Sequence, residues 1–201
     1  MTTSSPHPQS PKQLTLGRQP WLLALAVLLL VGVGAGIGWL AFNRTPSGMQ
    51  TFEGGGIRMT IPQDWTIEDT STNKACQTES LECVAILSTP QDYNFSITWY
   101  TQPEPTTVQM VDDTEWKKFV SYYPSAILFS REDLQVGGLP AIQRTFMQND
   151  EQNRTIYFRQ VYVLNELRLY LITTRFFSAE MMESQAATVD AVIASIHFTG
   201  E

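Results

Sequence analysis

Few side chains in this chain have the type and spacing that catalysis requires. The two histidines are His7, in a polar amino-terminal stretch, and His197, which alternates with apolar residues near the carboxyl terminus. That alternation is typical of a surface-facing strand residue rather than of a general base. No G-x-S-x-G turn, no phosphate-binding glycine loop ahead of a helix and no Cys-His nucleophile spacing occurs. We therefore predict no catalytic residue and no enzyme; the weaker alternative is an enzyme that uses only carboxylates, such as Asp150 and Glu151.

An acidic cluster is formed by Asp112, Asp113 and Glu115. Its carboxylates could bind a metal ion, but they also fit the start of a helix. Asp112 fits the N-cap position, and Glu115 lies three residues later, as in a capping box. Val111 and Trp116 would form the hydrophobic staple across that cap. Negative charge near a helix amino terminus is also stabilised by the helix dipole. We therefore expect a helix capped by Asp112, and we predict neither a metal nor another cofactor.

Cys76 and Cys83, the only cysteines, enclose a short loop with the sequence CQTESLEC. Two interpretations remain open, a disulfide bond and a pair of reduced thiols. The redox spacing C-x-x-C is absent, and none of the common zinc-ligand spacings occurs. Outside the cytoplasm the two thiols would tend to pair, and closing so small a ring stabilises a fold by about 2.5 kcal/mol. We predict a structural disulfide without a catalytic role.

The longest apolar stretch, residues 21–42, reads WLLALAVLLLVGVGAGIGWLAF and contains no charged or amide side chain. As a helix it would be roughly 33 Å long, enough to cross a hydrocarbon core of about 30 Å. Cleavage of a secretory signal is the competing interpretation, but the apolar core is unusually long for one and no A-x-A-like site closes it. We predict a transmembrane signal anchor over residues 20–42, after a disordered tail of residues 1–19.

Small residues recur in this predicted span. Gly32 and Gly36 form one G-x-x-x-G spacing, and Gly34 and Gly38 form a second one on the opposite side of the helix. Glycine lets two helix backbones approach closely. The span could therefore pair with a second copy or with a membrane-protein partner, and the alternative is that it only tethers the following domain to the membrane. If the span pairs, replacing all four glycines with leucine would abolish association in membranes.

Charge is distributed unevenly along the chain. All 20 acidic residues follow Asn43, whereas Lys12 and Arg18 precede the span without any acid. The positive-inside rule keeps such a tail cytoplasmic and places the following domain outside the cytoplasm. The domain carries a net charge of about −9 and no basic stripe, so we predict no nucleic-acid partner.

The rest of the chain has the length and pattern of one folded domain, residues 49–201, after a linker at residues 43–48. A helix is expected after Ser178, which fits its N-cap. Period-2 alternation and apolar runs predict strands over residues 57–61, 84–87, 95–100, 127–136, 141–147, 155–164 and 167–176, with a short edge strand at 196–199. The last two long strands are apolar on both faces, so helices should cover both faces of the sheet.

Several segments of this domain resemble the PsbP-like superfamily. They are an aromatic and glycine opening (52–56), an Ile-Pro and Asp-Trp turn (61–65), a glycine-proline turn (136–141), the strand LYLITT (169–174) and the ending ASIHF (194–198). The resemblance covers about residues 50–199. It implies an α+β fold in which an antiparallel sheet lies between helical layers, an α/β/α sandwich. It also implies a binding or assembly role and brings no catalytic residue.

We accordingly expect a single-pass membrane protein whose extracytoplasmic PsbP-like domain is a non-catalytic module for a ligand or partner. The predicted binding surface is an apolar patch lined by Trp65, Trp99 and Tyr100. The alternative is an accessory subunit of a membrane complex, recruited through the glycine-rich span.

Overall fold

The structure is a computed structural model that describes residues 48–70, 76 and 82–199. These residues belong to the second of two units of the chain, Thr45–Glu201. Within the described ranges, no helix is long and apolar enough to cross a membrane. The predicted span at residues 20–42, with its four glycines, lies outside the described residues and stays a prediction.

The described part of the chain consists of ten strands and two helices. In chain order they are β1 (Met49–Gly54), β2 (Ile57–Pro62), β3 (Thr66–Ile67), β4 (Glu82–Ser88), β5 (Asn94–Thr101), α2 (Val108–Tyr122), β6 (Ile127–Val136), β7 (Leu139–Asn149), β8 (Thr155–Asn165), β9 (Arg168–Phe176), α3 (Ala179–Ala194) and β10 (His197–Phe198). Every strand predicted from the sequence is present within a few residues of its expected bounds. Strands β1 and β3 are additions that the apolar pattern did not indicate.

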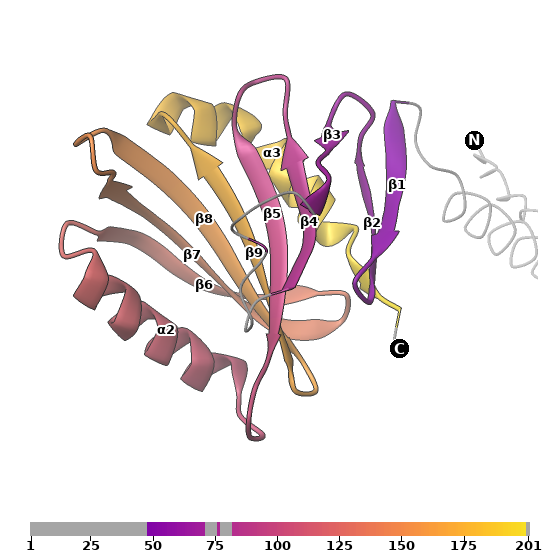
Figure 1. Cartoon of the computed structure of the whole chain (residues 1–201), viewed down its shortest axis with the longest axis horizontal. Helices are drawn as coiled ribbons and strands as arrows, with labels where there is room; N and C mark the ends of the chain where they lie inside the picture. Colours follow the sequence, from indigo (N-terminus) through magenta and orange to yellow (C-terminus); the bar gives the residue numbers. More distant parts are fainter. Residues whose placement is uncertain (1–47, 71–75, 77–81, 200–201) are drawn as a thin grey trace, which may run out of the picture. The chain divides into compact units, whose positions relative to one another are not determined.

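Seven strands form one antiparallel sheet in the order β3-β4-β5-β9-β8-β7-β6 (Figure 1). Strands β6 to β9 are joined to their neighbours by hairpins, whereas β5 pairs with β9 across a long sequence separation. The β5–β9 register runs from Asn94 opposite Arg175 to Thr101 opposite Arg168. This pairing places the strand before α2 beside the strand before α3, and it confirms the expected antiparallel sheet.

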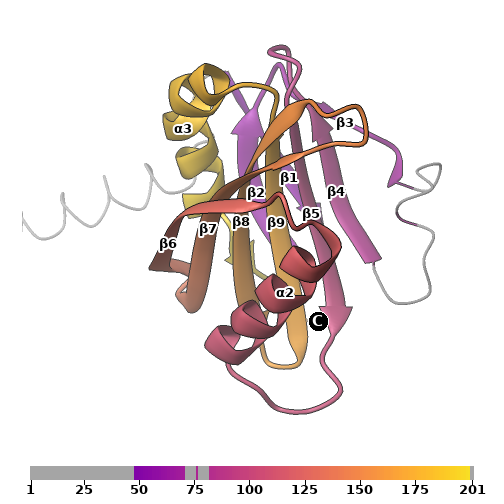
Figure 2. The same ribbon diagram turned by 90° about the vertical axis from the view of Figure 1, so that its left-hand side faces the viewer.

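Helix α2 covers one face of this sheet, where it packs on β7 and β8 (Figure 2). Val108 and Val111 of the helix lie in a buried cluster with Ile142, Tyr162 and Leu169 of the sheet. The three sheet residues come from three adjacent strands and share one face, because side chains alternate along each strand.

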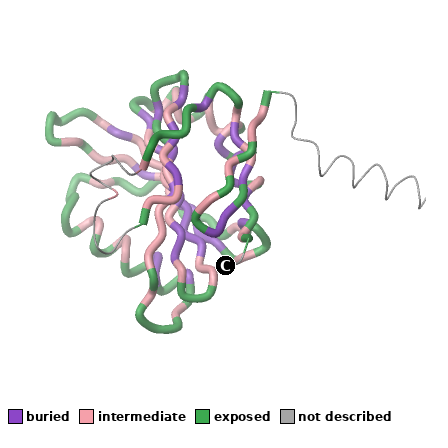
Figure 3. Tube along the Cα trace, turned by 45° about the vertical axis from the view of Figure 1, so that its right-hand side comes forward, coloured by how far each residue is buried: buried purple, intermediate pink, exposed green. Residues whose placement is uncertain are grey.

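The opposite face is covered by α3 together with a second, three-stranded sheet in the order β1-β2-β10. Val189, Val192 and Ile193 of α3 belong to the same buried cluster as Met59 of β2 and Val161 of β8. Figure 3 shows buried positions along the strands and exposed ones at many of the connecting loops. The α/β/α expectation is therefore confirmed for two helix-covered faces, with the correction that a small sheet completes one layer.

The two helix starts differ in how well they were predicted. Ser178 caps α3 as expected, and its hydroxyl accepts a hydrogen bond from the Met181 N–H at 3.1 Å. The prediction for α2 is wrong: the N-cap is Thr107, whose hydroxyl accepts from the Met110 N–H at 3.2 Å. Asp112 therefore lies inside the helix, with its side chain fully buried.

The cysteine prediction is confirmed. Cys76 and Cys83 form a disulfide bond, and none of the described cysteines is free. Cys83 lies in β4, so the bond ties the preceding connection to the sheet next to β5. In the chain-entropy account this ring stabilises the domain by about 2.5 kcal/mol.

Candidate functional site

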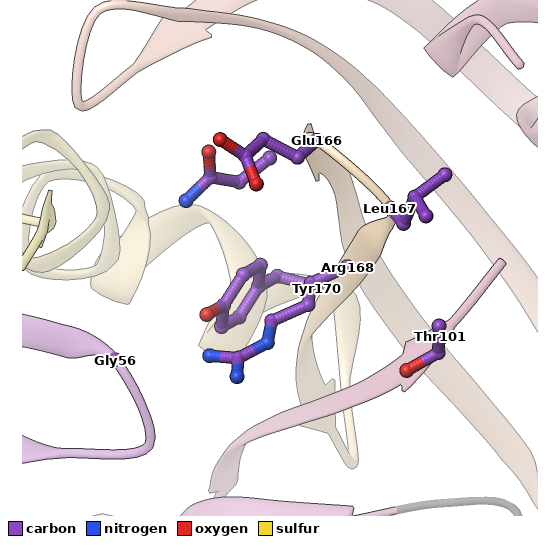
Figure 4. A pocket seen from close by; sticks show the side chains of 7 residues that line it. Gly56, Thr101, Glu166, Leu167, Arg168 and Tyr170 are labelled. Carbon is purple, nitrogen blue, oxygen red and sulfur yellow. The ribbon is translucent and has the colours of Figure 1, made fainter. Parts of the chain in front are cut away.

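A pocket lies at the end of the β8–β9 hairpin, where the turn between β1 and β2 approaches the sheet (Figure 4). Its volume is about 300 Å³. The lining residues come from the turn before β2, the end of β5 and the hairpin: Gly56, Thr101, Asn165, Glu166, Leu167, Arg168 and Tyr170. The pocket thus joins the small sheet and the large sheet at one site.

Arg168 is the cationic group of this pocket. Its guanidinium carbon lies 4.8 Å from the centre of the Trp99 ring, on the neighbouring strand β5. A guanidinium over an indole face is attracted by the ring quadrupole, and this contact orients the planar group. The side chain is half-buried and makes no ion pair with another described residue.

The β1–β2 turn forms the opposite wall, and its glycines allow the close approach. Gly55 and Gly56 have φ values of 56° and 74°, the left-handed conformation that glycine adopts without strain. A Cβ on Gly56 would lie 2.9 Å from the Tyr170 hydroxyl oxygen and 3.3 Å from Nη1 of Arg168. The Tyr170 hydroxyl donates a hydrogen bond to the Gly55 carbonyl at 3.2 Å, which holds the turn against β9.

The pocket combines hydrogen-bond donors with one opposing charge. Arg168 offers guanidinium N–H groups, and Asn165 and Thr101 offer an amide and a hydroxyl. Glu166, at the tip of the hairpin, is exposed and supplies a carboxylate. None of the lining residues is a cysteine, a histidine or a serine, and no group of three or more metal-binding side chains occurs in the described part of the chain. This set can hold a ligand through hydrogen bonds and an ion pair.

The three aromatic residues predicted to form one patch lie apart. Trp65 is only 3% exposed and packs against Tyr93 and Phe95, with ring centres 5.8 and 5.6 Å away. Trp99 and Tyr100 are consecutive in β5 and therefore point to opposite faces of the sheet. Of the three, only Trp99 contacts a residue of the β8–β9 pocket, whereas Trp65 lines a separate pocket beside Pro62 and Gln185. The three residues therefore do not form one patch.

Tyr100 belongs instead to the α2 side of the sheet, near the Glu115 carboxylate. Burial, followed by the nearby Glu115 charge, raises the pKa of Tyr100 well above its usual value. Burial and the same carboxylate also raise the pKa of Tyr162 on β8. Both phenols stay protonated at physiological pH and can donate hydrogen bonds, so they are unsuited to act as bases.

The acidic cluster predicted to cap α2 has another role. Both Asp112 carboxylate oxygens accept hydrogen bonds from Arg144, and Arg131 Nε donates to the second oxygen at 2.8 Å. The Asp112 and Arg144 side chains are 0% and 3% exposed, and the Arg144 guanidinium lies over the Trp116 ring at 4.8 Å. The cluster joins α2 to β6 and β7, which is a structural task.

Two pocket residues, Arg168 and Gly56, were missed as site residues in the sequence. Arg168 is a charged residue at the start of an otherwise apolar strand, and the run Gly54–Gly56 indicated only the approach to a strand. The predicted turn is also shifted by one residue, because Asn165 pairs with Arg168 and the turn residues are Glu166 and Leu167. The signal in the sequence that could have identified Arg168 was its position as a single positively charged residue beside a predicted hairpin turn.

Comparison with known proteins identifies the fold but not a family. No protein-family model and no curated protein matches the chain. The solution structure of cyanobacterial PsbP (CyanoP) from Synechocystis sp. PCC 6803 is similar, with a TM-score of 0.55 and 15% identity, covering 76% of this chain and 93% of that one.

Two further solved structures share the fold. The Ran-binding protein Mog1p of Saccharomyces cerevisiae has a TM-score of 0.50 and 8% identity, covering 75% of this chain and 96% of that one. The type VI secretion immunity protein TplEi of Pseudomonas aeruginosa, complexed with "L" peptide, has a TM-score of 0.50 and 10% identity, covering 76% and 99%. The domain therefore has a PsbP-like fold, as the sequence resemblance predicted.

Proposed function

We propose that this chain is a membrane-anchored binding protein whose PsbP-like domain, outside the cytoplasm, holds a protein partner at the β8–β9 pocket and performs no catalysis. The observation that carries the proposal is Arg168, a half-buried cation that stacks on Trp99 and has no ion-pair partner among the described residues. Holding a charge partly out of water costs free energy unless a counter-charge is supplied. A bound partner would supply it.

The form of the pocket favours a protein partner. Leu167, at the tip of the hairpin, is 40% exposed beside the pocket and adds an apolar contact next to the cation. Arginine and tryptophan, the two residues in contact here, are enriched among the residues that dominate the affinity of protein interfaces. The fold is compatible with this use, since the names of two solved structures describe Ran binding and a peptide complex for those proteins.

The pocket can be tested by photo-crosslinking in native membranes. A photo-crosslinking amino acid at Leu167 of the full chain is expected to capture one partner. Replacing Arg168 with alanine should reduce that capture about tenfold or more, as for an arginine hot spot. The control position is Gln152, an exposed residue in the hairpin at the other end of β8. Equal capture from Leu167 and Gln152, or none from Leu167, would contradict the proposal.

The anchor and the placement of the domain are part of the same proposal. Their support is the uncharged stretch at residues 20–42, the acid-free tail before it and the Cys76–Cys83 disulfide. Disulfides persist in exported proteins and are rare in the cytoplasm. An integral single-pass protein whose tail stays inside would carry all three features.

Thiol reactivity in cells tests this placement. The full chain is expected to show no free thiol when it is alkylated in denaturant without reductant. Replacing Leu28 and Leu30 with arginine adds about 2.5–3.5 kcal/mol per residue to the cost of insertion and should leave two reactive thiols. The matched control replaces the same two residues with isoleucine and should keep the disulfide. Reactive thiols in the full chain would show that the domain stays in the cytoplasm.

A further inference from the structure

We propose that the β8–β9 pocket recognises a carboxylate group of the partner, held by the guanidinium of Arg168. The inference rests on the proposed binding function and specifies its chemistry. Two sources share this chemistry, the side chain of an aspartate or glutamate and the carboxyl terminus of a chain.

Arg168 differs from four other arginines of the domain in what it contacts. Arg131, Arg144, Arg154 and Arg159 each form an ion pair with an aspartate. Among the described residues, Arg168 contacts the Trp99 ring and lines the pocket without an ion pair; Arg175, over the Phe177 ring, also has no ion pair. A guanidinium carries five N–H donors, which point outward in the plane of the guanidinium itself. A contact with an aromatic ring does not give these donors a hydrogen-bond acceptor in that plane. The planar fork therefore remains available to a ligand from the pocket.

The surroundings of Arg168 hold it in one place before a ligand arrives. The Trp99 ring lies 4.8 Å from its guanidinium carbon, and Gly56 leaves room for Nη1, which would lie only 3.3 Å from a Cβ at that position. In Figure 4 the guanidinium lies beside the Tyr170 ring and is directed toward the Gly56 turn. A cation that is already oriented loses less conformational entropy on binding, which favours planar, two-point recognition.

The charges around the pocket favour a singly charged carboxylate over a phosphate. The domain carries a net negative charge, and Glu166 lies at the rim of the pocket. A dianionic phosphate would keep one uncompensated charge beside the single cation Arg168, and removing a dianion from water costs more free energy than removing a carboxylate. A carboxylate also matches the guanidinium fork with two parallel hydrogen bonds. The Glu166 carboxylate further implies that the residues next to the bound carboxylate are neutral or basic.

The test uses the full chain in nanodiscs with 15N-labelled tryptophan, and the indole N–H signal of Trp99 reports binding. Four probes are titrated: acetyl-Gly-Asp-Gly-amide, its Asn counterpart, acetyl-Gly-Gly-Leu with a free carboxylate, and the same peptide amidated. The Asp peptide or the free-carboxylate peptide is expected to shift the signal saturably. The matching neutral peptide should bind at least about tenfold more weakly, as for a charge-assisted hydrogen bond. Which of the two carboxylate peptides binds identifies the source.

Two substitutions in the pocket test whether Arg168 recognises the negative charge of the peptide. Arg168→Gln should abolish the difference between the charged and the neutral peptides, and Glu166→Gln should strengthen binding of the charged one. The other tryptophan signals show whether each variant is folded. Equal binding of charged and neutral probes, or tighter binding of inorganic phosphate, would overturn the carboxylate assignment.

Failure of this inference can be told apart from failure of the proposed function. If Leu167 captures a partner equally well in Arg168→Gln and in the unsubstituted chain, and captures more than Gln152 does, a partner binds at this hairpin without using Arg168. The carboxylate inference and the role given to Arg168 are then both wrong, whereas partner binding at the pocket stands. If the peptides bind but Leu167 captures nothing in native membranes, the pocket takes carboxylates and the proposed protein partner is wrong.

Discussion

Replacing Asp112 with alanine is expected to lower the free energy of unfolding of the domain by about 3–5 kcal/mol, because it leaves the buried Arg144 without its counter-ion. Arg144 is 3% exposed and donates two side-chain hydrogen bonds to the Asp112 carboxylate. Urea unfolding followed by tryptophan fluorescence measures the loss.

Two matched variants identify the cause of that loss. Asp113 is the neighbouring acid, 63% exposed and 3.7 Å from Arg144, and its replacement with alanine should cost at most about 1 kcal/mol. Replacing Asp112 with alanine and Arg144 with methionine together should recover part of the stability, because the buried guanidinium is removed with its counter-ion. Arg131 loses Asp112 as well, but it is 33% exposed and keeps Asp133 at 3.6 Å. If the Asp112 and Asp113 variants unfold at the same urea concentration, the buried charge cluster does not stabilise the attachment of α2.

Replacing Trp65 with alanine is expected to destabilise the domain by about 3–5 kcal/mol while leaving capture at the β8–β9 pocket intact in the fraction that is folded. The Trp65 side chain is 3% exposed and packs edge-on against Tyr93, so its removal opens a cavity in the core. Thermal and urea unfolding measure the stability, and photo-crosslinking from Leu167 measures binding.

An exposed aromatic residue gives the control for this substitution. Tyr122, at the end of α2, is 71% exposed, and its replacement with alanine should change the stability by less than about 0.5 kcal/mol. Trp99→Ala should show the opposite pattern to Trp65→Ala, with a clear loss of binding because Arg168 loses the ring that orients it. If the Trp65 variant keeps its stability but loses partner capture, Trp65 is part of the binding surface and the assignment to the core is wrong.

The outcome for the aromatic residues shows where pattern-based prediction is limited. Trp65, Trp99 and Tyr100 are all large aromatic residues. No feature of the neighbouring sequence distinguishes a tryptophan in the core from one beside a pocket. Their different positions depend on what packs against each face of the sheet: α3 and the small sheet on one face, and α2 on the other. Contacts of this kind join residues far apart in the chain.

Asp112 shows the same limit for a charged residue. Its spacing to Glu115 satisfies the rule for a capping box, yet Thr107 supplies the cap five residues earlier. The two arginines that bind Asp112 lie 19 and 32 residues further along the chain. A local rule cannot weigh an ion pair whose partners come into reach only when β6 and β7 pair in the sheet.

The amino-acid sequence by itself determined the features that depend on local periodicity and on local turn chemistry. These are the long strands, the cap of α3 at Ser178, the edge strand β10 and the pairing of Cys76 with Cys83. Only the tertiary structure decided that Arg168, Trp99 and Gly56 meet at one pocket, because this requires β5 to pair with β9 and the β1–β2 turn to pack on both. The physical reason is that the alternation of side chains along a strand determines which residues share a face of that strand. Which faces come into contact is determined only by the pairing of strands that are distant in the sequence.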